Sequence, residues 1–301
     1  MRKIFVGGIA FISIVVIGLI ALLVLSFWPS AKAKPLPKVD KIQSVNIPLA
    51  KYDKSTTKYA RDFVVSDIHG RFDSFKAALK TVNFSKSDRL FVLGDTIDRG
   101  PEGFHALLYL THTLPSEGYH VVVLTGNHED MWFEMASKGT TDKERQSNLN
   151  GQIDIYEGDA PNGWEASIKE WNALTANERA YLLNEMGTGF GEPRMLVMQI
   201  DGKWVSFSHS TNFTKTIETE TVNDLSWYNQ MKDSDDTFNK SVAAKLGVPE
   251  SDVQAFIGHI GGLRFGVHPH YICLDDTNTR DFSKSPGVPL YEIENGKFYK
   301  G

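Results

Sequence analysis

Short apolar runs that alternate with amphipathic helices constrain the fold of this chain most strongly. The sequence predicts strands over 62–66, 90–94 and 120–125, and helices over 72–82, 102–114 and 128–137. In the first helix Phe72, Phe75 and Leu79 recur at spacings of three and four, which places them on one apolar face. Such an alternation of strands and helices predicts parallel strands covered by helices, and therefore an α/β fold.

The second half of the chain favours β-structure after a polar interruption. Residues 139–192 are predicted to form a mostly helical insertion over the site, with a capping box at residues 175–178. Pairs of apolar runs flank Asp201-Gly202 and Asn295-Gly296, which are dipeptides typical of hairpin turns. Further strands are expected at 256–257 and 271–274, and the second holds the single cysteine, Cys273, as a core residue.

The N-terminal region contains a long uncharged stretch. Residues 4–28 carry no charged side chain, and as a helix they would span about 37 Å, enough to cross the roughly 30 Å apolar core of a bilayer. The sequence therefore predicts four parts, which are a tail over 1–3, a transmembrane anchor over 4–28, a tether over 29–58 and a catalytic domain over 59–301. The alternatives are a cleaved signal peptide, suggested by Ala31-Lys32-Ala33, and a buried helix.

Charge bears on topology and on partners. Arg2 and Lys3 favour a cytoplasmic N-terminus and hence an extracytoplasmic, periplasmic domain, whereas four lysines between residues 32 and 41 favour the opposite orientation. The chain has a net charge of −5 and its first 41 residues contribute +5, so the remainder carries −10. An acidic domain repels polyanions, which argues against nucleic acid as a partner.

Polar residues with the chemistry of metal ligands follow the apolar runs. They are Asp67, His69, Asp95, Asn127, His209 and His259. Carboxylate, imidazole and amide donors suit first-row divalent ions, with Mn²⁺ expected and Fe or Zn compatible. One carboxylate can bridge two ions, so we expect Asp67, His69 and Asp95 on one metal, and Asp95, Asn127, His209 and His259 on the other. His209 and His259 are weak signals individually. They are assigned as ligands because the upstream motifs lack the donors for a complete second site.

Three further residues could act on a phosphate group. His128 directly follows Asn127 and can point at a substrate, where it would protonate a leaving alkoxide. Asp98 is the natural carboxylate partner of that imidazole, and Arg99 offers a planar bidentate clamp for phosphate oxygens. We expect Arg99, Asn127 and His128 to contact the substrate.

The remaining histidines and tryptophans are expected to be structural. This group contains His105, His112, His120, His268, His270, Trp164, Trp171, Trp204 and Trp227. The tryptophans are interpreted as packing residues in preference to platforms on which a substrate stacks.

The three motifs Asp67-Ile68-His69-Gly70, Gly94-Asp95-Thr96-Ile97-Asp98-Arg99-Gly100 and Gly126-Asn127-His128-Glu129 resemble those of the calcineurin-like metallophosphoesterases. The resemblance covers roughly residues 61–275 and is closest to the phosphoprotein phosphatase branch, which includes bacterial serine/threonine protein phosphatases and symmetrical diadenosine tetraphosphate hydrolases. It implies a β-sandwich flanked by helices, with a dinuclear centre at loops on one edge. It also implies the same roles for the residues named above.

Three departures from the family pattern stand out. Ser66 replaces a glycine before the first motif, and His209 is followed by Ser210-Thr211 where the family has Gly or Ala-Gly. The protein phosphatases also carry an arginine between the two downstream histidines, and this chain has none there. Arg194 and Arg264 are the candidates to replace it.

These observations predict a membrane-anchored, metal-dependent phosphatase that hydrolyses phosphomonoesters, with phosphoprotein as the expected substrate, by attack of metal-bound hydroxide. One alternative is a symmetrical dinucleotide polyphosphate hydrolase, whose substrate needs more basic groups than this acidic domain obviously supplies. The other is a tethered, non-catalytic metal-binding protein. A site without catalysis would need neither the acid His128 nor the clamp Arg99.

Overall fold

The computed structural model of the chain describes residues 34–54, 57–156, 164–230, 232–261, 264–277 and 287–301. The anchor predicted over 4–28 lies outside this part of the chain and stays a prediction. Within the described ranges, we find no helix with the length and apolar character that a bilayer crossing requires.

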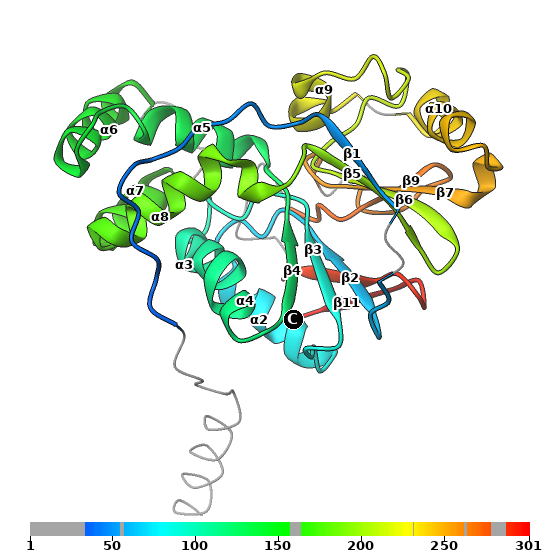
Figure 1. The fold of residues 1–301 in the computed structure, drawn as a ribbon, viewed down its shortest axis with the longest axis horizontal. Coiled ribbons are helices and arrows are strands. Elements are labelled where there is room, and N and C mark those ends of the chain that lie inside the picture. The colour runs from blue at the N-terminus through cyan, green and yellow to red at the C-terminus, as the bar shows by residue number, and fades with distance from the viewer. Residues whose placement is uncertain (1–33, 55–56, 157–163, 231, 262–263, 278–286) are drawn as a thin grey trace, which may run out of the picture. The chain divides into compact units, whose positions relative to one another are not determined.

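Two β-sheets form the centre of the fold (Figure 1). One sheet has the order β1-β5-β6-β7-β9-β8, with bounds Ala50–Asp53 (β1), Met195–Ile200 (β5), Lys203–Ser208 (β6), Val253–Ile257 (β7), Tyr271–Cys273 (β9) and Gly266–Val267 (β8). The other has the order β11-β10-β2-β3-β4, with bounds Lys297–Lys300 (β11), Pro289–Glu292 (β10), Asp62–Val65 (β2), Arg89–Val92 (β3) and His120–Val123 (β4). Strands β2, β3 and β4 run parallel, and so do β6 and β7, so the carboxyl ends of each set share an edge.

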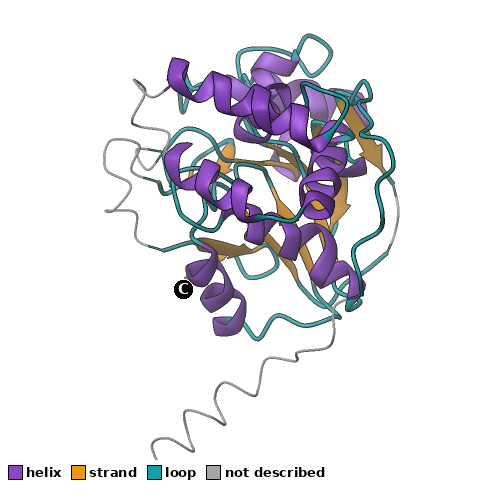
Figure 2. Cartoon of the chain, turned by 90° about the vertical axis from the view of Figure 1, so that its left-hand side faces the viewer, coloured by secondary structure: helices purple, strands orange, loops and turns teal. Residues whose placement is uncertain are grey.

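Helices lie over the strands (Figure 2). They are α2 (Phe72–Thr81), α3 (Gly103–Leu108), α4 (Leu114–Ser116), α5 (Asn127–Ala136), α6 (Asp142–Tyr156), α7 (Trp164–Ala173), α8 (Ala176–Gly187), α9 (Val222–Trp227) and α10 (Thr237–Leu246). A π-helical turn, η1 (Tyr109–Thr113), joins α3 to α4, and short 3₁₀ turns form η3 (Gly189–Gly191) and η4 (Glu250–Asp252). Each strand and helix predicted between 62 and 137 is present within a few residues of its expected bounds.

Three apolar clusters hold the layers together. Phe91 of β3 stacks on Phe207 of β6 at 4.2 Å between ring centroids, within a cluster that both sheets supply. Phe75 and Leu79 of α2 belong to the cluster between the second sheet and its helices, as their spacing predicts. Burial of a side chain as large as phenylalanine contributes roughly 1.5–3 kcal/mol, so the layered core carries much of the stability. The arrangement is a mixed α/β sandwich flanked by helices.

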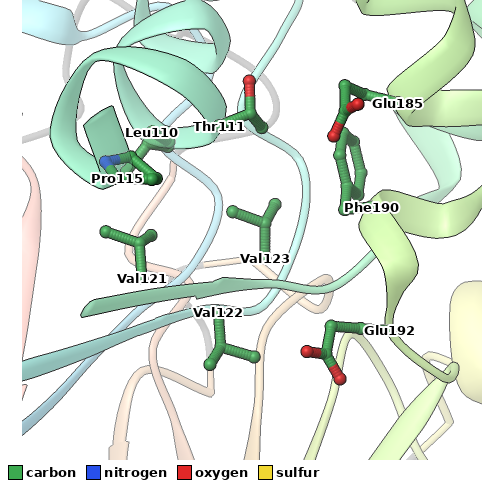
Figure 3. Close-up of a pocket in the computed structure, with 9 residues that line it drawn as sticks. All are labelled: Leu110, Thr111, Pro115, Val121, Val122, Val123, Glu185, Phe190 and Glu192. Atoms are coloured by element: carbon green, nitrogen blue, oxygen red, sulfur yellow. The ribbon is translucent and has the colours of Figure 1, made fainter. Parts of the chain in front are cut away.

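Strand β4 illustrates the alternation that produces these layers. Figure 3 shows Val121 and Val123 on one side of the strand and Val122 on the other. Val123 accordingly lies in the helix-covered cluster, whereas Val122 packs against the cluster between the sheets. A small pocket here is also lined by Glu185 and Glu192, and it contains none of the residues predicted for the site.

The tether predicted over 29–58 requires a correction. Strand β1 pairs in parallel with β5, and the Val45 N–H donates to the Gly187 carbonyl oxygen at 3.0 Å. Leu36 and Val39 also pack against the helix-covered core. The polar composition of this segment gave no signal for a strand. Strand β1 forms at the edge of the sheet because β5 supplies its hydrogen bonds.

The region between the two halves is helical, and both hairpins form. Helices α7 and α8 pack on α3, and Trp171 is buried in the shared core. None of the residues predicted for the site lies on α6, α7 or α8. Turns at Asp201-Gly202 and Asn295-Gly296 join β5 to β6 and β10 to β11, as predicted. Helices α9 and α10, which follow β6, were not predicted.

Candidate metal centre

The residues predicted as ligands all lie just beyond the carboxyl ends of strands. Asp67 and His69 follow β2, Asp95 follows β3, Asn127 begins α5 after β4, His209 follows β6 and His259 follows β7. Since parallel strands present these ends at the same edge, residues distant in sequence converge there. All are buried except His259, which is partly buried.

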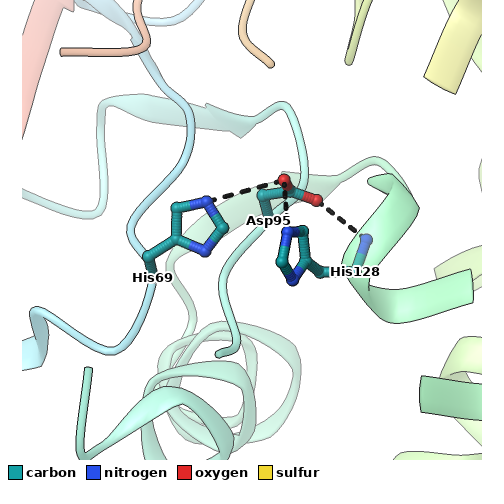
Figure 4. A group of neighbouring side chains, drawn as sticks. All are labelled: His69, Asp95 and His128. Carbon is teal, nitrogen blue, oxygen red and sulfur yellow. Dashed lines mark hydrogen bonds and ion pairs between the residues drawn. The ribbon is translucent and has the colours of Figure 1, made fainter. Parts of the chain in front are cut away.

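Asp95 lies between His69 and His128 (Figure 4). Its Oδ2 atom lies 3.6 Å from His69 Nε2 and 3.8 Å from His128 Nε2. The His128 backbone N–H also donates to Asp95 Oδ1 at 3.1 Å. Asp67 is nearby, with its Oδ1 atom 3.8 Å from His69 Nε2. The donors that the structure groups on this side are therefore His69, Asp95 and His128, with Asp67 next to His69.

Asp95 also faces a second group of donors. Its Oδ2 atom lies 3.3 Å from His209 Nε2, and His259 completes a set of three groups that could hold an ion. Asn127 Oδ1 lies 2.9 Å from His209 Nε2. Asp95 is thus shared by both groups, which is the position that a bridging carboxylate requires.

Backbone carbonyl groups orient two histidine rings. His69 Nδ1 bonds to the Ile97 carbonyl oxygen at 2.8 Å, and His209 Nδ1 bonds to the Leu93 carbonyl oxygen at 2.9 Å. A hydrogen bond from Nδ1 to a carbonyl oxygen keeps the ring proton on Nδ1. The lone pair of Nε2 is then available to bind a metal.

The backbone at the site adopts a conformation that non-glycine residues rarely use. Positive φ angles of 47–68° occur at Asp67, His69, Asp95, Asp98, Arg99 and His259. Each costs of order 1–3 kcal/mol and persists where the surroundings over-determine it, typically at functional sites. Glycines make room for these turns, and a Cβ on Gly258 would overlap the Asp67 carboxylate.

The carboxylates have strongly perturbed acidities. Burial raises the pKa of Asp67 well above its ordinary value, and the Asp275 charge adds to this effect. Burial also raises the pKa of Asp95, but the His209 and His128 rings outweigh it and hold that pKa well below its usual range. Buried carboxylates and imidazoles whose acceptor atoms face one another are suited to a shared cation. The donor set therefore fits two divalent ions.

His128 and Asp98 form a buried pair. His128 Nδ1 donates to Asp98 Oδ2 at 2.7 Å. Burial lowers the pKa of His128, but the Asp95 and Asp98 carboxylates raise it by more, so the net pKa is raised. A raised pKa keeps a proton on the ring near neutral pH, as a general acid needs.

Arg99 is held by a chain of hydrogen bonds through Thr277 and Asp275. Its Nη1 atom donates to Thr277 Oγ1 at 3.1 Å, and the Thr277 hydroxyl donates to Asp275 Oδ1 at 2.5 Å. Asp275 Oδ2 in turn accepts from the Gly261 N–H, just after His259, at 2.6 Å. Thr277 and Asp275 were missed in the sequence, and no local pattern there points to them.

Glu129 was quoted in the third motif without a role, and the structure gives it one. Its carboxylate accepts from the backbone N–H groups of Asp95, Thr96 and Gly126 at 2.7–3.0 Å. Burial and the Asp95 charge raise the pKa of Glu129 to about 7. The spacing from Gly126 to Glu129 is that of a capping box, a signal that could have identified this residue.

Both candidate replacements for the missing arginine pair with a carboxylate. Arg194 forms a two-pronged pair with Asp130, with Nη2 at 2.9 Å from Oδ1. Arg264 Nη1 lies 3.0 Å from Asp233 Oδ1. Each guanidinium is therefore already engaged by a carboxylate, which disfavours both candidates as the phosphate clamp.

Known proteins share both the fold and parts of the sequence. Symmetrical bis(5'-nucleosyl)-tetraphosphatases from Delftia acidovorans and Acidovorax sp. are 33% and 41% identical over 103 and 90 residues. These matches cover 34% and 30% of this chain and 35% and 30% of the relatives, so the chain spans about a third of their length. A solved structure described as a diadenosine tetraphosphatase matches with a TM-score of 0.53 at 15% identity, over 84% of this chain and 97% of that one.

The family itself is identified by a longer match. The family model described as calcineurin-like phosphoesterase matches residues 63–291. This range contains both sheets' central strands and every residue predicted for the site. The chain therefore belongs to the calcineurin-like phosphoesterase family.

Proposed function

We propose that this protein hydrolyses phosphate esters or phosphoanhydrides at a centre of two divalent metal ions. The observation that carries the proposal is the position of Asp95, whose carboxylate faces both ligand groups at once. Bound there, two ions would supply Lewis acidity toward phosphoryl oxygens and a water of lowered pKa as the nucleophile. We expect Mn²⁺, with Fe or Zn as other ions that this donor set accepts.

His128 acts as the general acid in this proposal. Its Nδ1–H is engaged by Asp98, so Nε2–H is the proton available to the substrate. The water loses one proton to solvent as its oxygen bonds to phosphorus, the bond from phosphorus to the leaving oxygen breaks, and that oxygen takes the Nε2 proton. Arg99 binds the phosphoryl oxygens through its guanidinium. Water is the nucleophile, so we expect no covalent phosphoenzyme.

Dinucleotide polyphosphates are the substrate class that the relatives favour. The curated relatives are named as symmetrical tetraphosphatases, and the identity with them reaches 41% over 90 residues. The matches leave most of each relative uncovered, so we carry over only the cleavage of a polyphosphate and not the relatives' full specificity. Cleavage would then occur at a phosphoanhydride bond in place of a phosphomonoester.

Phosphoprotein is the second candidate, as predicted from the sequence. It is favoured by the engagement of Arg194 and Arg264 with carboxylates, because a long polyphosphate would gain nothing from either. Arg99 donates to Thr277 and pairs with no carboxylate among the described residues, and one guanidinium suffices for one phosphoryl group.

A panel of substrates tests both the activity and its class. The chain is stripped of metal, reloaded with Mn²⁺ and given diadenosine tetraphosphate, phosphoserine and phosphotyrosine peptides, and p-nitrophenyl phosphate. We expect turnover in at least one arm, and a His128→Asn variant should keep its metal but lose most turnover. Metal binding without turnover in every arm would contradict the proposal and favour the non-catalytic metal-binding alternative.

We also propose that residues 4–28 anchor the domain in a membrane, with the domain outside the cytoplasm. The uncharged stretch supports the anchor, and Arg2 with Lys3 supports the orientation. Fractionation of cells followed by protease treatment of intact spheroplasts tests both points. Soluble protein would contradict the anchor, and protection from protease would reverse the orientation.

A further inference from the structure

Trp227 stands beside the metal centre with much of its ring uncovered. This residue ends α9 and is 44% exposed. Its ring lies 6.1 Å from the His259 ring between centroids, at 80° between the planes. Trp227 is therefore not buried as a purely packing residue would be. An exposed indole next to a predicted ligand is placed to contact what enters the site.

A departure from the family pattern holds the helix that carries Trp227. The Ser210 N–H donates to the Leu225 carbonyl oxygen at 2.9 Å, and its hydroxyl donates to the Asp224 carbonyl oxygen at 2.5 Å. The same hydroxyl accepts from the Tyr228 N–H at 3.1 Å. Ser210 is fully buried. The glycine or alanine usual after this histidine has no hydroxyl, so two of these bonds depend on the serine.

A hollow of about 430 Å³ opens along this helix. It is lined by Asn223, Asp224, Trp227 and Tyr228. The Asp224 carboxylate is engaged by Lys215 Nζ at 2.6 Å and by Asn212 Nδ2 at 3.0 Å. Asn223 is exposed, and its side-chain amide offers a donor and an acceptor at the rim. The hollow therefore combines aromatic surface with one hydrogen-bonding edge.

We propose that Trp227 is a stacking platform for a nucleobase of the substrate, and that Ser210 holds it in place. A nucleobase has a π-face that stacks on indole and a polar edge that an Asn amide can pair with. A phenolic ring also has a π-face, but it lacks the adjacent donor and acceptor of a nucleobase edge. The Asn223 amide therefore favours a nucleobase over a phenol. This inference rests on the proposed function and narrows it to nucleotide-containing polyphosphates.

Equilibrium binding of ADP and of pyrophosphate tests the platform without turnover. Both ligands are titrated calorimetrically into the Mn²⁺-loaded chain and its variants. Trp227→Ala should weaken ADP binding about five- to a hundredfold more than it weakens pyrophosphate binding, as expected for the loss of one stacked base. Trp227→Phe should restore most of the affinity for ADP, and Ser210→Ala should weaken ADP binding by a smaller factor.

A matched control lies on the same helix. Val222 begins α9 and is 43% exposed, so Val222→Ala should change the binding of neither ligand. Equal losses for ADP and pyrophosphate in Trp227→Ala would overturn the platform, since they indicate damage to the centre. Unchanged ADP binding would overturn it as well, and so would a loss restricted to phosphotyrosine when that ligand is titrated.

The proposed function is tested separately by hydrolysis. Wild-type protein that fails to hydrolyse any phosphate ester or anhydride contradicts the proposed function. The ADP comparison still reports on the platform in that case, because it measures binding alone. Diadenosine tetraphosphate turnover with a KM raised in Trp227→Ala and little change in kcat would support both.

Discussion

Replacing Glu129 with glutamine should destabilise the protein and loosen Asp95, because this buried carboxylate binds three backbone N–H groups. Glu129 Oε2 accepts from Asp95 at 2.9 Å and from Gly126 at 3.0 Å, and Oε1 accepts from Thr96 at 2.7 Å. Glutamine has one acceptor oxygen where glutamate has two. In its best orientation, the glutamine oxygen accepts from the Asp95 and Gly126 N–H groups. The Thr96 N–H then faces the side-chain NH₂ group and has no acceptor.

The magnitude follows from these bonds. One buried N–H left without a partner costs about 1–3 kcal/mol. Loss of the charge adds nothing to this, because burial and the Asp95 carboxylate already disfavour it. We therefore expect a loss of about 1–3 kcal/mol in the free energy of unfolding. For a domain of this size, each kcal/mol lowers Tm by roughly 2–4 °C, so the fall should be about 2–12 °C.

Thermal unfolding and metal content are the measurements. Glu129→Gln should lower Tm and reduce the metal retained after dialysis, because the Asp95 backbone N–H loses part of its support. Glu134 lies on the same helix and is exposed, so Glu134→Gln is the matched control and should leave both quantities unchanged. A Tm within about 1 °C of wild type, with undiminished metal, would refute the reasoning.

Three further predictions concern acid catalysis, bridging and pH. Asp98→Asn should lower kcat more for an alkyl phosphate than for p-nitrophenyl phosphate, since His128 loses its carboxylate partner, and equal losses would contradict the acid role. Asp95→Asn should reduce both metals in elemental analysis, whereas full metal content would rule out a bridge. Burial and the Asp224 charge raise the pKa of Glu220 to about 8. The folded state therefore holds a proton that the unfolded chain releases, and stability falls as the pH rises from about 4.5 to 8, by at most about 5 kcal/mol. Glu220→Gln should raise Tm more at pH 9 than at pH 5, and equal gains would contradict this linkage.

Local pattern was sufficient for much of the fold. The apolar faces of β2, β3 and α2 and the turn dipeptides at residues 201–202 and 295–296 predicted elements that the structure contains. Strand β1 escaped prediction because it is short and depends on hydrogen bonds to β5, far along the chain. Helix α9 is also short and was missed, although Thr221 and Asp224 form a capping box that could have identified its start. Sequence spacing reports geometry along one segment and carries no signal from a partner far along the chain.

The sequence by itself determined the chemical inventory of this protein. The order of Asp67, His69, Asp95, Asn127 and His128 after apolar strands indicates donors for divalent ions, because strand ends are where parallel sheets present polar groups. It also indicated the family, through three motifs whose spacing is specific.

Only the tertiary structure decided how that inventory is arranged. It brings Asp95 between two groups of donors, ties Arg99 to Thr277, and turns Trp227 outward beside His259. It also engages Arg194 with Asp130. These outcomes depend on distances between residues far apart in the chain, and those distances are set by the packing of two sheets and their helices.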